Sequence, residues 1–210
     1  MLIEKKGLEI LDEIDSSSPT PGGGSISALV AALGISLSRM YAHLSIHKKK
    51  FLSLEENVQQ QFHEHFTALE SLKAELIQAI DQDCEAYDHV MTAYRLPKTT
   101  DEENQHRQKE IQKATYIAIE SPYHIMELSL KALHLCEKMI EQGNKNAVSD
   151  LACGILFLDA AVQGAGLNVE INLSSLDEKE KLEWNTKMEN LLNESHQIKA
   201  RSIKQIKTLL

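Results

Sequence analysis

Apolar residues recur every three or four positions over residues 58–94, and no other feature of the sequence restricts the fold as strongly. The members of this run are Val58, Phe62, Phe66, Leu69, Leu72, Leu76, Ile80, Cys84, Tyr87, Met91 and Tyr94. Their mean spacing is that of an α-helix and predicts one helix of about 40 residues, roughly 60 Å long. A helix of that length buries its apolar side only against other long helices. The sequence therefore predicts an all-α protein, an elongated bundle that two subunits could share.

Start signals divide the rest of the chain into about seven helices, within a single domain over residues 1–210. A serine or threonine three residues before a glutamate favours a helix start, because each side chain caps a backbone N–H group. This pattern predicts helices that start after Ser53, Thr100 and Ser175.

Proline and glycine predict further boundaries. The helix that follows Thr100 is expected to end near Ile119, and a new one to start at Pro122, where proline is tolerated in the first turn. Gly143–Asn144 is a typical C-terminal cap and predicts the end of that helix. Residues 167–173 alternate in polarity, but without a partner strand they favour a helix or an extended connector.

The predicted helix over residues 25–44 carries small residues along one side. These are Ser25, Ala28, Ala32 and Ile35, with Gly34 beside them. A side made of small residues lets another helix approach closely. We therefore expect this side to form a core contact or a dimer contact.

The overall charge excludes one class of function and says little about others. The formal net charge is -9, so a general nucleic-acid binder is not expected. An anionic substrate would need basic residues concentrated locally. The nine histidines show no metal-ligand spacing on one helix, and we expect no metal.

The three cysteines are far apart and show no zinc or redox spacing, which favours reduced thiols in a cytoplasmic protein. The charges among residues 1–14 argue against an export signal. Residues 151–166 are apolar but contain Asp159 and are shorter than the roughly 20 residues that span a membrane. We expect a buried helix there and no membrane contact.

A stretch rich in proline and glycine, "SSSPTPGGGS" (residues 16–25), directly precedes the helix of small residues. Its glycines fit neither a P-loop nor a dinucleotide-binding fingerprint. Free backbone N–H groups at a helix start could still hold an anion or a polar heterocycle. The alternative is a flexible helix start.

Asp83 is the candidate acid–base residue, because it shares the predicted buried side of the long helix with Ile80 and Tyr87. A carboxylate held away from water and without a cation has a raised proton affinity, as a general acid or base requires. The alternative is an ion pair or hydrogen bond to a neighbouring helix.

Basic residues gather in two places in this acidic chain. They are the run Lys48–Lys50 and the pair Arg95 and Lys98. The alternatives to anion binding are surface solubility for the run and a favourable interaction with the helix dipole for the pair. A fourth stretch, "GNKNAVSD" (residues 143–150), is a candidate site or simply a helix cap.

Several of these stretches together resemble one family. "PTPGGGSISALVAALG", "LSIHKKKF", "DQDCEAYDHVMTAYRLPKTTDEE", "GNKNAVSD" and "NVEINL" extend from Pro19 to Leu173. In this combination and order the chain is similar to the formiminotransferase-cyclodeaminase C-terminal family, which includes stand-alone bacterial cyclodeaminases and methenyltetrahydrofolate cyclohydrolases. The resemblance implies an all-helical homodimer that acts on folate, including polyglutamated folate, without a cofactor beyond tetrahydrofolate itself.

The implied chemistry concerns the one-carbon bridge between N5 and N10 of tetrahydrofolate. Cyclodeaminases close a 5-formimino group onto N10 and release ammonia, which gives the 5,10-methenyl form. Cyclohydrolases open the same bridge with water and give 10-formyltetrahydrofolate. We expect no attached formiminotransferase domain, which slightly favours the cyclohydrolase.

The resemblance also implies residue roles. Asp83 would move the proton and stabilise the methenyl cation. Backbone donors to the pterin or its bridging carbon would be Gly22, Gly23, Gly24 and Ser25. Contacts to the glutamate-tail carboxylates would come from Lys48, Lys49, Lys50, Arg95 and Lys98. Two further substrate-binding residues would be Asn144 and Asp150.

The chain departs from the usual pattern of the family at His43, His47, Phe51 and Cys84. The histidines motivate one alternative, a folate-binding protein without activity. The long capped helices without a cofactor motif motivate another, a purely structural bundle.

Overall fold

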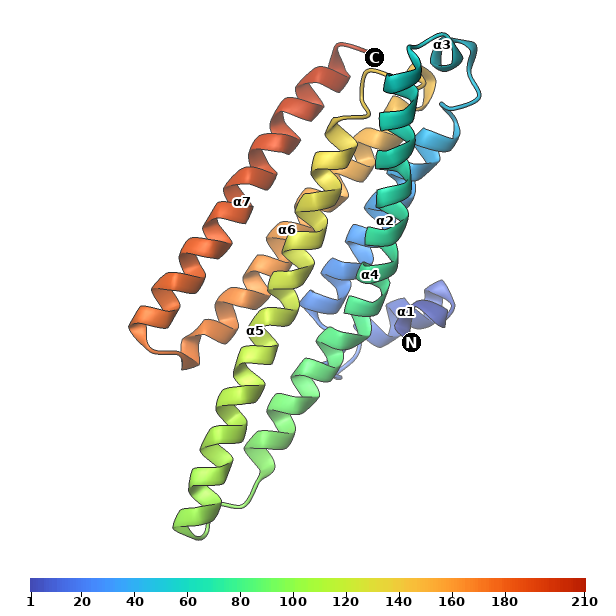
Figure 1. The fold of residues 1–210 in the computed structure, drawn as a ribbon. Coiled ribbons are helices and arrows are strands. Elements are labelled where there is room, and N and C mark those ends of the chain that lie inside the picture. The colour runs from blue at the N-terminus through green and yellow to red at the C-terminus, as the bar shows by residue number, and fades with distance from the viewer.

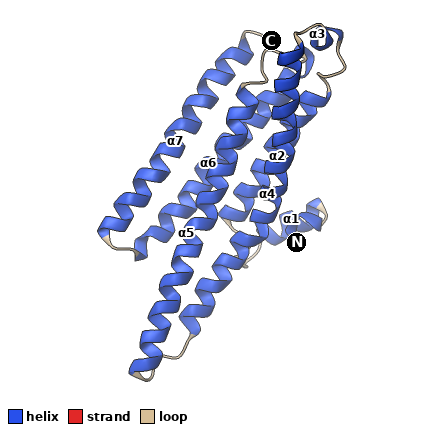
Figure 2. Ribbon diagram, viewed as in Figure 1, coloured by secondary structure: helices blue, strands red, loops and turns tan.

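The computed structural model describes residues 1–210 and contains helices but no strand (Figures 1 and 2). Its seven α-helices are α1 (Gly7–Ile14), α2 (Gly23–His43), α3 (Lys49–Leu52), α4 (Glu56–Arg95), α5 (Asp101–Glu137), α6 (Val148–Asn172) and α7 (Glu178–Lys207). Three single 3-10 turns lie at Leu2–Glu4, Lys145–Ala147 and Leu173–Ser175. The all-α class and the number of helices are confirmed.

Four long helices build the core. α2 packs against α4 and α6, α5 packs against the same two helices, and α7 covers α5 and α6 from outside. One connected cluster of 37 buried apolar residues joins all of them, so the bundle has a single core. Figure 1 shows that the C-terminal half of α4 and the N-terminal half of α5 extend beyond the other helices as a hairpin.

The long apolar run forms α4 as predicted, over 40 residues. Phe62, Leu69, Leu76 and Ile80 are buried in the bundle. Tyr94 is exposed, because the last turns of α4 lie in the hairpin beyond the core.

Of the three predicted capping boxes, only the one at Thr100 is confirmed. Its hydroxyl accepts from the Glu103 N–H, and the Glu103 carboxylate accepts from the Thr100 N–H. The Ser53 prediction is wrong, because that hydroxyl donates to the Lys50 carbonyl. The Ser175 prediction is also wrong, since Asp177 caps α7 instead.

The predicted break before Pro122 does not occur. α5 continues through this proline to Glu137, so the predicted stop at Gly143–Asn144 is wrong as well. A proline inside a helix has no N–H for the carbonyl four residues earlier. Here that carbonyl belongs to Ala118, and it accepts instead from the side-chain amide of Asn172 at 2.8 Å.

The small-residue side of α2 lies in the core, one of the two predicted outcomes. A Cβ on Gly34 would lie 2.8 Å from the Gly154 carbonyl oxygen, and a Cβ on Gly23 equally close to Asn168. Because Gly154 and Asn168 belong to α6, α2 and α6 run antiparallel in close contact. Residues 167–173, one of the stretches left open above, are helical as far as Asn172.

Two helical segments, Gly23–His43 and Lys145–Ser175, are long and apolar enough to cross a membrane by length and composition alone. About half of each apolar window is buried inside the bundle, 56% and 50% respectively. Core helices of this kind pass the same test, so the finding is weak support for a membrane protein.

Candidate active site

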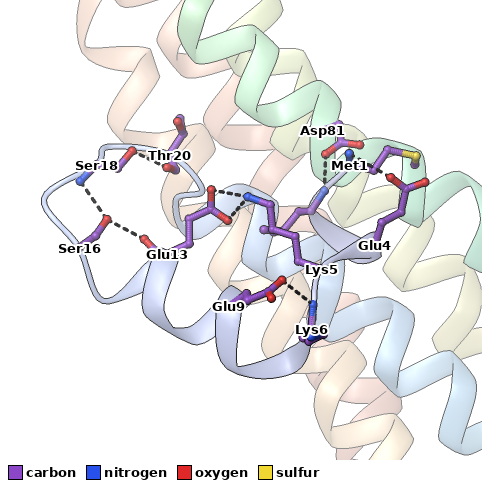
Figure 3. A network of polar contacts seen from close by, with 11 residues as sticks. Met1, Glu4, Lys5, Lys6, Glu9, Glu13, Ser16, Ser18, Thr20 and Asp81 are labelled. Atoms are coloured by element: carbon purple, nitrogen blue, oxygen red, sulfur yellow. Dashed lines mark hydrogen bonds and ion pairs between the residues drawn. The ribbon is translucent and has the colours of Figure 1, made fainter.

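A hydrogen bond joins the N-terminal segment to α4 at Asp81, two residues before the candidate acid–base residue Asp83 (Figure 3). The Leu2 N–H donates to Asp81 at 3.1 Å, and Lys5 forms an ion pair with Glu13 at 2.6 Å. Further hydrogen bonds hold the loop Ser16–Thr20 that follows α1. Asp81 therefore has a structural partner, and the loop is placed where α2 begins.

A cavity of about 340 Å³ lies between this loop, the start of α2, the middle of α4 and α5, and the end of α6. Its walls are formed by Pro19, Thr20, Gly22, Gly23, Asp83, Ala86, Tyr87, Val90, Ala118, Asn168, Ile171 and Asn172. Small-molecule sites usually measure about 300–1,000 Å³. The volume suits a flat ring system, with the rest of a larger ligand outside.

Asp83 reaches from α4 to the first turn of α2. The Ser25 hydroxyl donates to Asp83 Oδ2 at 2.9 Å, and the Ser121 hydroxyl donates to Oδ1 at 3.4 Å. Ser121, which directly precedes Pro122 within α5, is thus a partner of the candidate acid–base residue. The hydrogen-bond alternative considered for Asp83 holds, and it coexists with a place in the cavity wall.

Burial raises the pKa of the Asp83 carboxyl above its ordinary value. The hydroxyl and the backbone N–H of Ser25 oppose this rise, as does the Ser121 hydroxyl more weakly, because they favour the ionised form. No lysine, arginine or histidine pairs with this carboxylate. Asp83 can therefore accept and return a proton at the cavity wall.

The three consecutive glycines make room for side chains of other helices. A Cβ on Gly24 would lie 2.4 Å from Asp83 Oδ1, and a Cβ on Gly23 would lie 2.8 Å from the Asn168 amide. Gly22 and Gly23 also form part of the cavity wall, whereas Gly24 and Ser25 are buried beneath it.

Asn168 and Asn172 are site residues that the sequence analysis did not single out. The Nδ2 atom of Asn168 donates to the Gly164 carbonyl at 2.8 Å, and that of Asn172 to the Ala118 carbonyl. The Oδ1 atoms of these two residues of the cavity wall accept no hydrogen bond within the protein and remain available as acceptors. Both residues lie in "NVEINL", where a helical reading would have placed them on one side, four residues apart.

Arg95 and Lys98 are exposed and do not reach the cavity wall. Arg95 is twelve residues after Asp83, which corresponds to about 18 Å along α4. They lie along the hairpin on the Asp83 side of the molecule.

The remaining predicted residues lie at the opposite end of the bundle. Lys48 and Lys49 precede α4, and the helix from Glu56 to Asp83 alone measures about 40 Å. Asn144 is attached to this same end, where its side chain donates to the Leu44 carbonyl and its N–H to the Ser45 hydroxyl.

Asp150 lies in the first turn of α6, about 27 Å before Asn168 along that helix. One chain alone therefore does not bring these residues to Asp83. No cluster of three or more histidine, cysteine or acidic residues is arranged to hold a metal ion.

The unusual residues of this sequence fall in different places. Cys84 Sγ lies 3.2 Å from the Ser25 hydroxyl, directly beside the candidate acid–base residue. His43 lies at the far end of α2, with its ring edge against Phe66 at a centroid distance of 4.7 Å.

The fold and the site define an all-α bundle protein with a carboxyl group of raised pKa in the wall of a ligand-sized cavity. The sequence model of the formiminotransferase-cyclodeaminase family matches residues 8–190, and the chain belongs to this family.

Its relatives include both activities of that family. The chain is 36% identical to a methenyltetrahydrofolate cyclohydrolase of Methylorubrum extorquens, over 94% of each chain. It is 34% identical to the formimidoyltransferase-cyclodeaminase of Gallus gallus over 88% of this chain, but it spans only 34% of that longer protein. A crystal structure of formiminotetrahydrofolate cyclodeaminase from Thermotoga maritima superimposes with a TM-score of 0.80 and 26% identity, over 100% of this chain and 98% of that one.

Proposed function

We propose that this protein is a tetrahydrofolate one-carbon enzyme that opens 5,10-methenyltetrahydrofolate with water to 10-formyltetrahydrofolate. The observation that carries the proposal is the half-buried Asp83 carboxyl in the wall of the cavity, which has no cationic partner. A relative that is 36% identical over 94% of each chain is named a cyclohydrolase, which supports this direction.

Asp83 would act in both halves of the reaction. Water adds to the carbon that bridges N5 and N10, and Asp83 accepts one of its protons. The bond from this carbon to N5 then breaks, Asp83 returns the proton to N5, and the hydroxyl proton leaves to solvent as the formyl C=O forms. The negative charge of Asp83 also stabilises the methenyl cation before water adds.

The neighbouring residues suit the pterin ring. The free Oδ1 atoms of Asn168 and Asn172 are acceptors for ring and amino N–H groups. Because Gly22 and Gly23 have no side chain, a flat ring can approach their backbone. The glutamate tail then extends out of the cavity. No cofactor beyond the folate is needed for these steps.

Cyclodeamination is the second candidate, because the superimposing crystal structure carries that name. Both reactions pass through a carbon bonded to N5, to N10 and to a third group, either an amine or a hydroxyl. In this direction Asp83 would donate a proton to the departing amine.

Two absorbance assays test the proposal. Purified protein is given 5,10-methenyltetrahydrofolate, and the loss of its near-ultraviolet absorbance is followed; it is separately given 5-formiminotetrahydrofolate, and the rise is followed. We expect turnover in the first assay. A folded protein that is inactive in both but binds folate by calorimetry would be the non-catalytic binder, and one that does not bind would be a structural bundle.

The proposal extends to assembly and location. A homodimer is supported by the large apolar side chains that α2 and α6 leave exposed, and a cytoplasmic location by the free thiols and by the charges near the N-terminus. Both are measurable, by light scattering and by fractionation of cells.

A further inference from the structure

Cys84 follows the candidate acid–base residue directly on α4, but it is not part of the cavity wall. Its Sγ atom lies 3.2 Å from the hydroxyl oxygen of Ser25, which is fully buried in the first turn of α2. The same hydroxyl donates to Asp83 Oδ2 at 2.9 Å. Thiol, hydroxyl and carboxylate therefore form one chain of hydrogen bonds, and only the carboxylate end reaches the cavity.

The number of protons fixes the direction of this chain while Asp83 is ionised. A carboxylate only accepts hydrogen bonds, and the Ser25 hydroxyl has a single proton to donate. Because that proton goes to Asp83, the contact with Cys84 uses the S–H group as donor and the serine oxygen as acceptor. The thiol thus holds the Ser25 hydroxyl in the orientation that serves Asp83.

Ser25 differs in this respect from the other serines of α2. Ser27, Ser36 and Ser38 each donate to the backbone carbonyl four residues earlier in their own helix, at 2.6, 2.8 and 2.9 Å. The Ser25 hydroxyl instead has both its partners on α4. Its orientation is therefore decided by the contact between two helices.

The surroundings of Cys84 keep its proton in place. Burial raises the pKa of the thiol, and three carboxylates of α4 raise it further; they belong to Asp81, Asp83 and Asp88. The Ser25 hydroxyl opposes this rise. The thiolate is disfavoured on balance, so Cys84 retains the S–H group that the chain requires.

The helices packed against α4 contribute no charged group to this chain. From α2, α5 and α6 come only hydroxyl, amide and backbone groups, which belong to Ser25, Ser121, Asn168 and Asn172. In the N-terminal segment the charges pair with each other, the terminal amine with Glu4 and Lys5 with Glu13. On α4 itself, Tyr87 is the other titratable side chain of the cavity wall. Hydrogen bonds are therefore what opposes the effect of burial on Asp83.

We infer that Cys84 is a positioning residue for the proposed reaction: its S–H group donates to Ser25, strengthens the hydrogen bond from Ser25 to Asp83, and thereby stabilises the ionised carboxylate. The inference rests on the proposed function, in which Asp83 accepts a proton from water. Hydrogen bonds in a chain polarise one another, so the thiol reinforces a bond in which it takes no direct part. Cys84 is also a position at which this sequence departs from the usual pattern of its family.

The pH dependence of kcat tests the inference through activity. Cys84→Ala removes the donor, so the pKa of Asp83 should rise and the acid limb of kcat should move to higher pH, by less than in Ser25→Ala. KM at the pH optimum should not change, because Cys84 is not part of the cavity wall. In a Ser25→Ala background, Cys84→Ala should add no shift, since the thiol acts through this hydroxyl. An equal shift in both backgrounds would overturn the inference.

Further variants separate hydrogen bonding from volume. Cys84→Val fills the space without a donor and should match Cys84→Ala, whereas Cys84→Ser keeps a donor and should restore part of the wild-type profile. Cys153→Ala removes the exposed cysteine of α6 and should leave the profile in place. A wild-type profile in Cys84→Val would reduce Cys84 to a space-filling role.

The S–H stretching band gives a readout that needs no substrate. It absorbs where proteins have no other infrared band, and its frequency falls when the S–H group donates a hydrogen bond. The difference between wild type and Cys84→Ala isolates the Cys84 band, which should move to higher frequency as the pH falls and Asp83 takes up a proton. The same difference should not move in an Asp83→Asn background, and should still move in Asp81→Asn.

The two readouts distinguish the inference from the proposed function. A Cys84 band that does not respond to the ionisation of Asp83 would overturn the inference, whatever the turnover. A protein that is inactive in both absorbance assays, but whose Cys84 band follows Asp83, would defeat the proposed function and leave the hydrogen-bond chain in place.

Discussion

The carboxyl group of Asp83 occupies the space in which Gly24 would carry a side chain. A Cβ at this position would come within 2.4 Å of Oδ1 and 2.5 Å of Oδ2, far inside normal contact distance. Gly24 is therefore needed for the placement of the Asp83 carboxyl, which comes from another helix, in addition to any contact with a ligand.

Gly24→Ala should reduce turnover strongly and stability little. The new methyl group pushes the Asp83 carboxyl from its place, and a shift of about 1 Å at a reacting group can cost on the order of 10²-fold in rate. Alanine gains about 1 kcal/mol of helix propensity over glycine, which offsets the displacement. Steady-state kinetics and thermal unfolding measure the two effects.

Gly7→Ala is the matched control for this substitution, because a Cβ there meets nothing within 4 Å. It should keep full turnover. Normal kinetics in Gly24→Ala would show that the position of the Asp83 carboxyl does not matter for the reaction.

Asp83→Asn should abolish most turnover while the fold remains intact. General acid–base catalysis contributes about 10²–10⁴-fold, and the loss of kcat should lie in that range. Asp81→Asn is the control, since that carboxylate only accepts from the Leu2 N–H. Circular dichroism checks the fold, and wild-type kcat in Asp83→Asn would make this residue structural.

The same substitution should change the pH dependence of stability. The pKa of Asp83 is raised in the folded state, so the folded protein binds this proton more tightly than the unfolded chain. This tighter binding stabilises the folded protein fully at a pH below the pKa of Asp83 in the unfolded chain. The stabilisation is lost as the pH rises through the pKa of Asp83 in the folded protein. Asp83→Asn should therefore melt higher than the wild type at neutral pH, with a difference that shrinks in acid; equal melting temperatures throughout would contradict this.

Ser25→Ala should shift the pH–rate profile. The Ser25 hydroxyl donates to Asp83 and holds the pKa of that carboxyl lower than burial alone would. Without it the pKa rises further, and the acid limb of kcat should move to higher pH. Ser36→Ala, on the same helix but bonded only to a backbone carbonyl, should leave the profile in place.

Asn168→Ala should weaken substrate binding more than it slows chemistry. The free Oδ1 atom at the cavity is a single neutral acceptor, worth about 1 kcal/mol, or roughly five-fold in KM. Asn193→Ala, on the exposed side of α7, is the control. A fall in kcat without a change in KM would place Asn168 in the chemistry instead.

Leu33→Asp should separate the proposed dimer. Leu33 is 49% exposed on α2, among the apolar side chains that support the proposed dimer, and a carboxylate buried there between two subunits without a partner would be costly. Light scattering should report a monomer that remains helical. Leu182→Asp, at a 68% exposed position on α7, should leave the assembly unchanged.

The sequence alone determined the helices whose signals are local. The periodicity that predicts α4 and the cap at Thr100 each depend on residues only three or four positions apart. Both can therefore be recognised from neighbouring residues in the sequence. The acid–base candidate was found in the same way, because Asp83 shares its helical side with buried neighbours. The resemblance to a family added the chemistry, and it rests on residue identities alone.

Only the tertiary structure decided what depends on contacts between distant segments. α5 runs through Pro122 because Asn172, fifty residues later, satisfies the carbonyl that the proline leaves free. Gly24 is required because Asp83 reaches it from another helix. The lysines lie far from the cavity because the part of α4 from Glu56 to Asp83, about 40 Å long, separates them. The spacing of neighbouring residues in the sequence contains no information about these contacts between distant segments, because the contacts form only when the helices pack together.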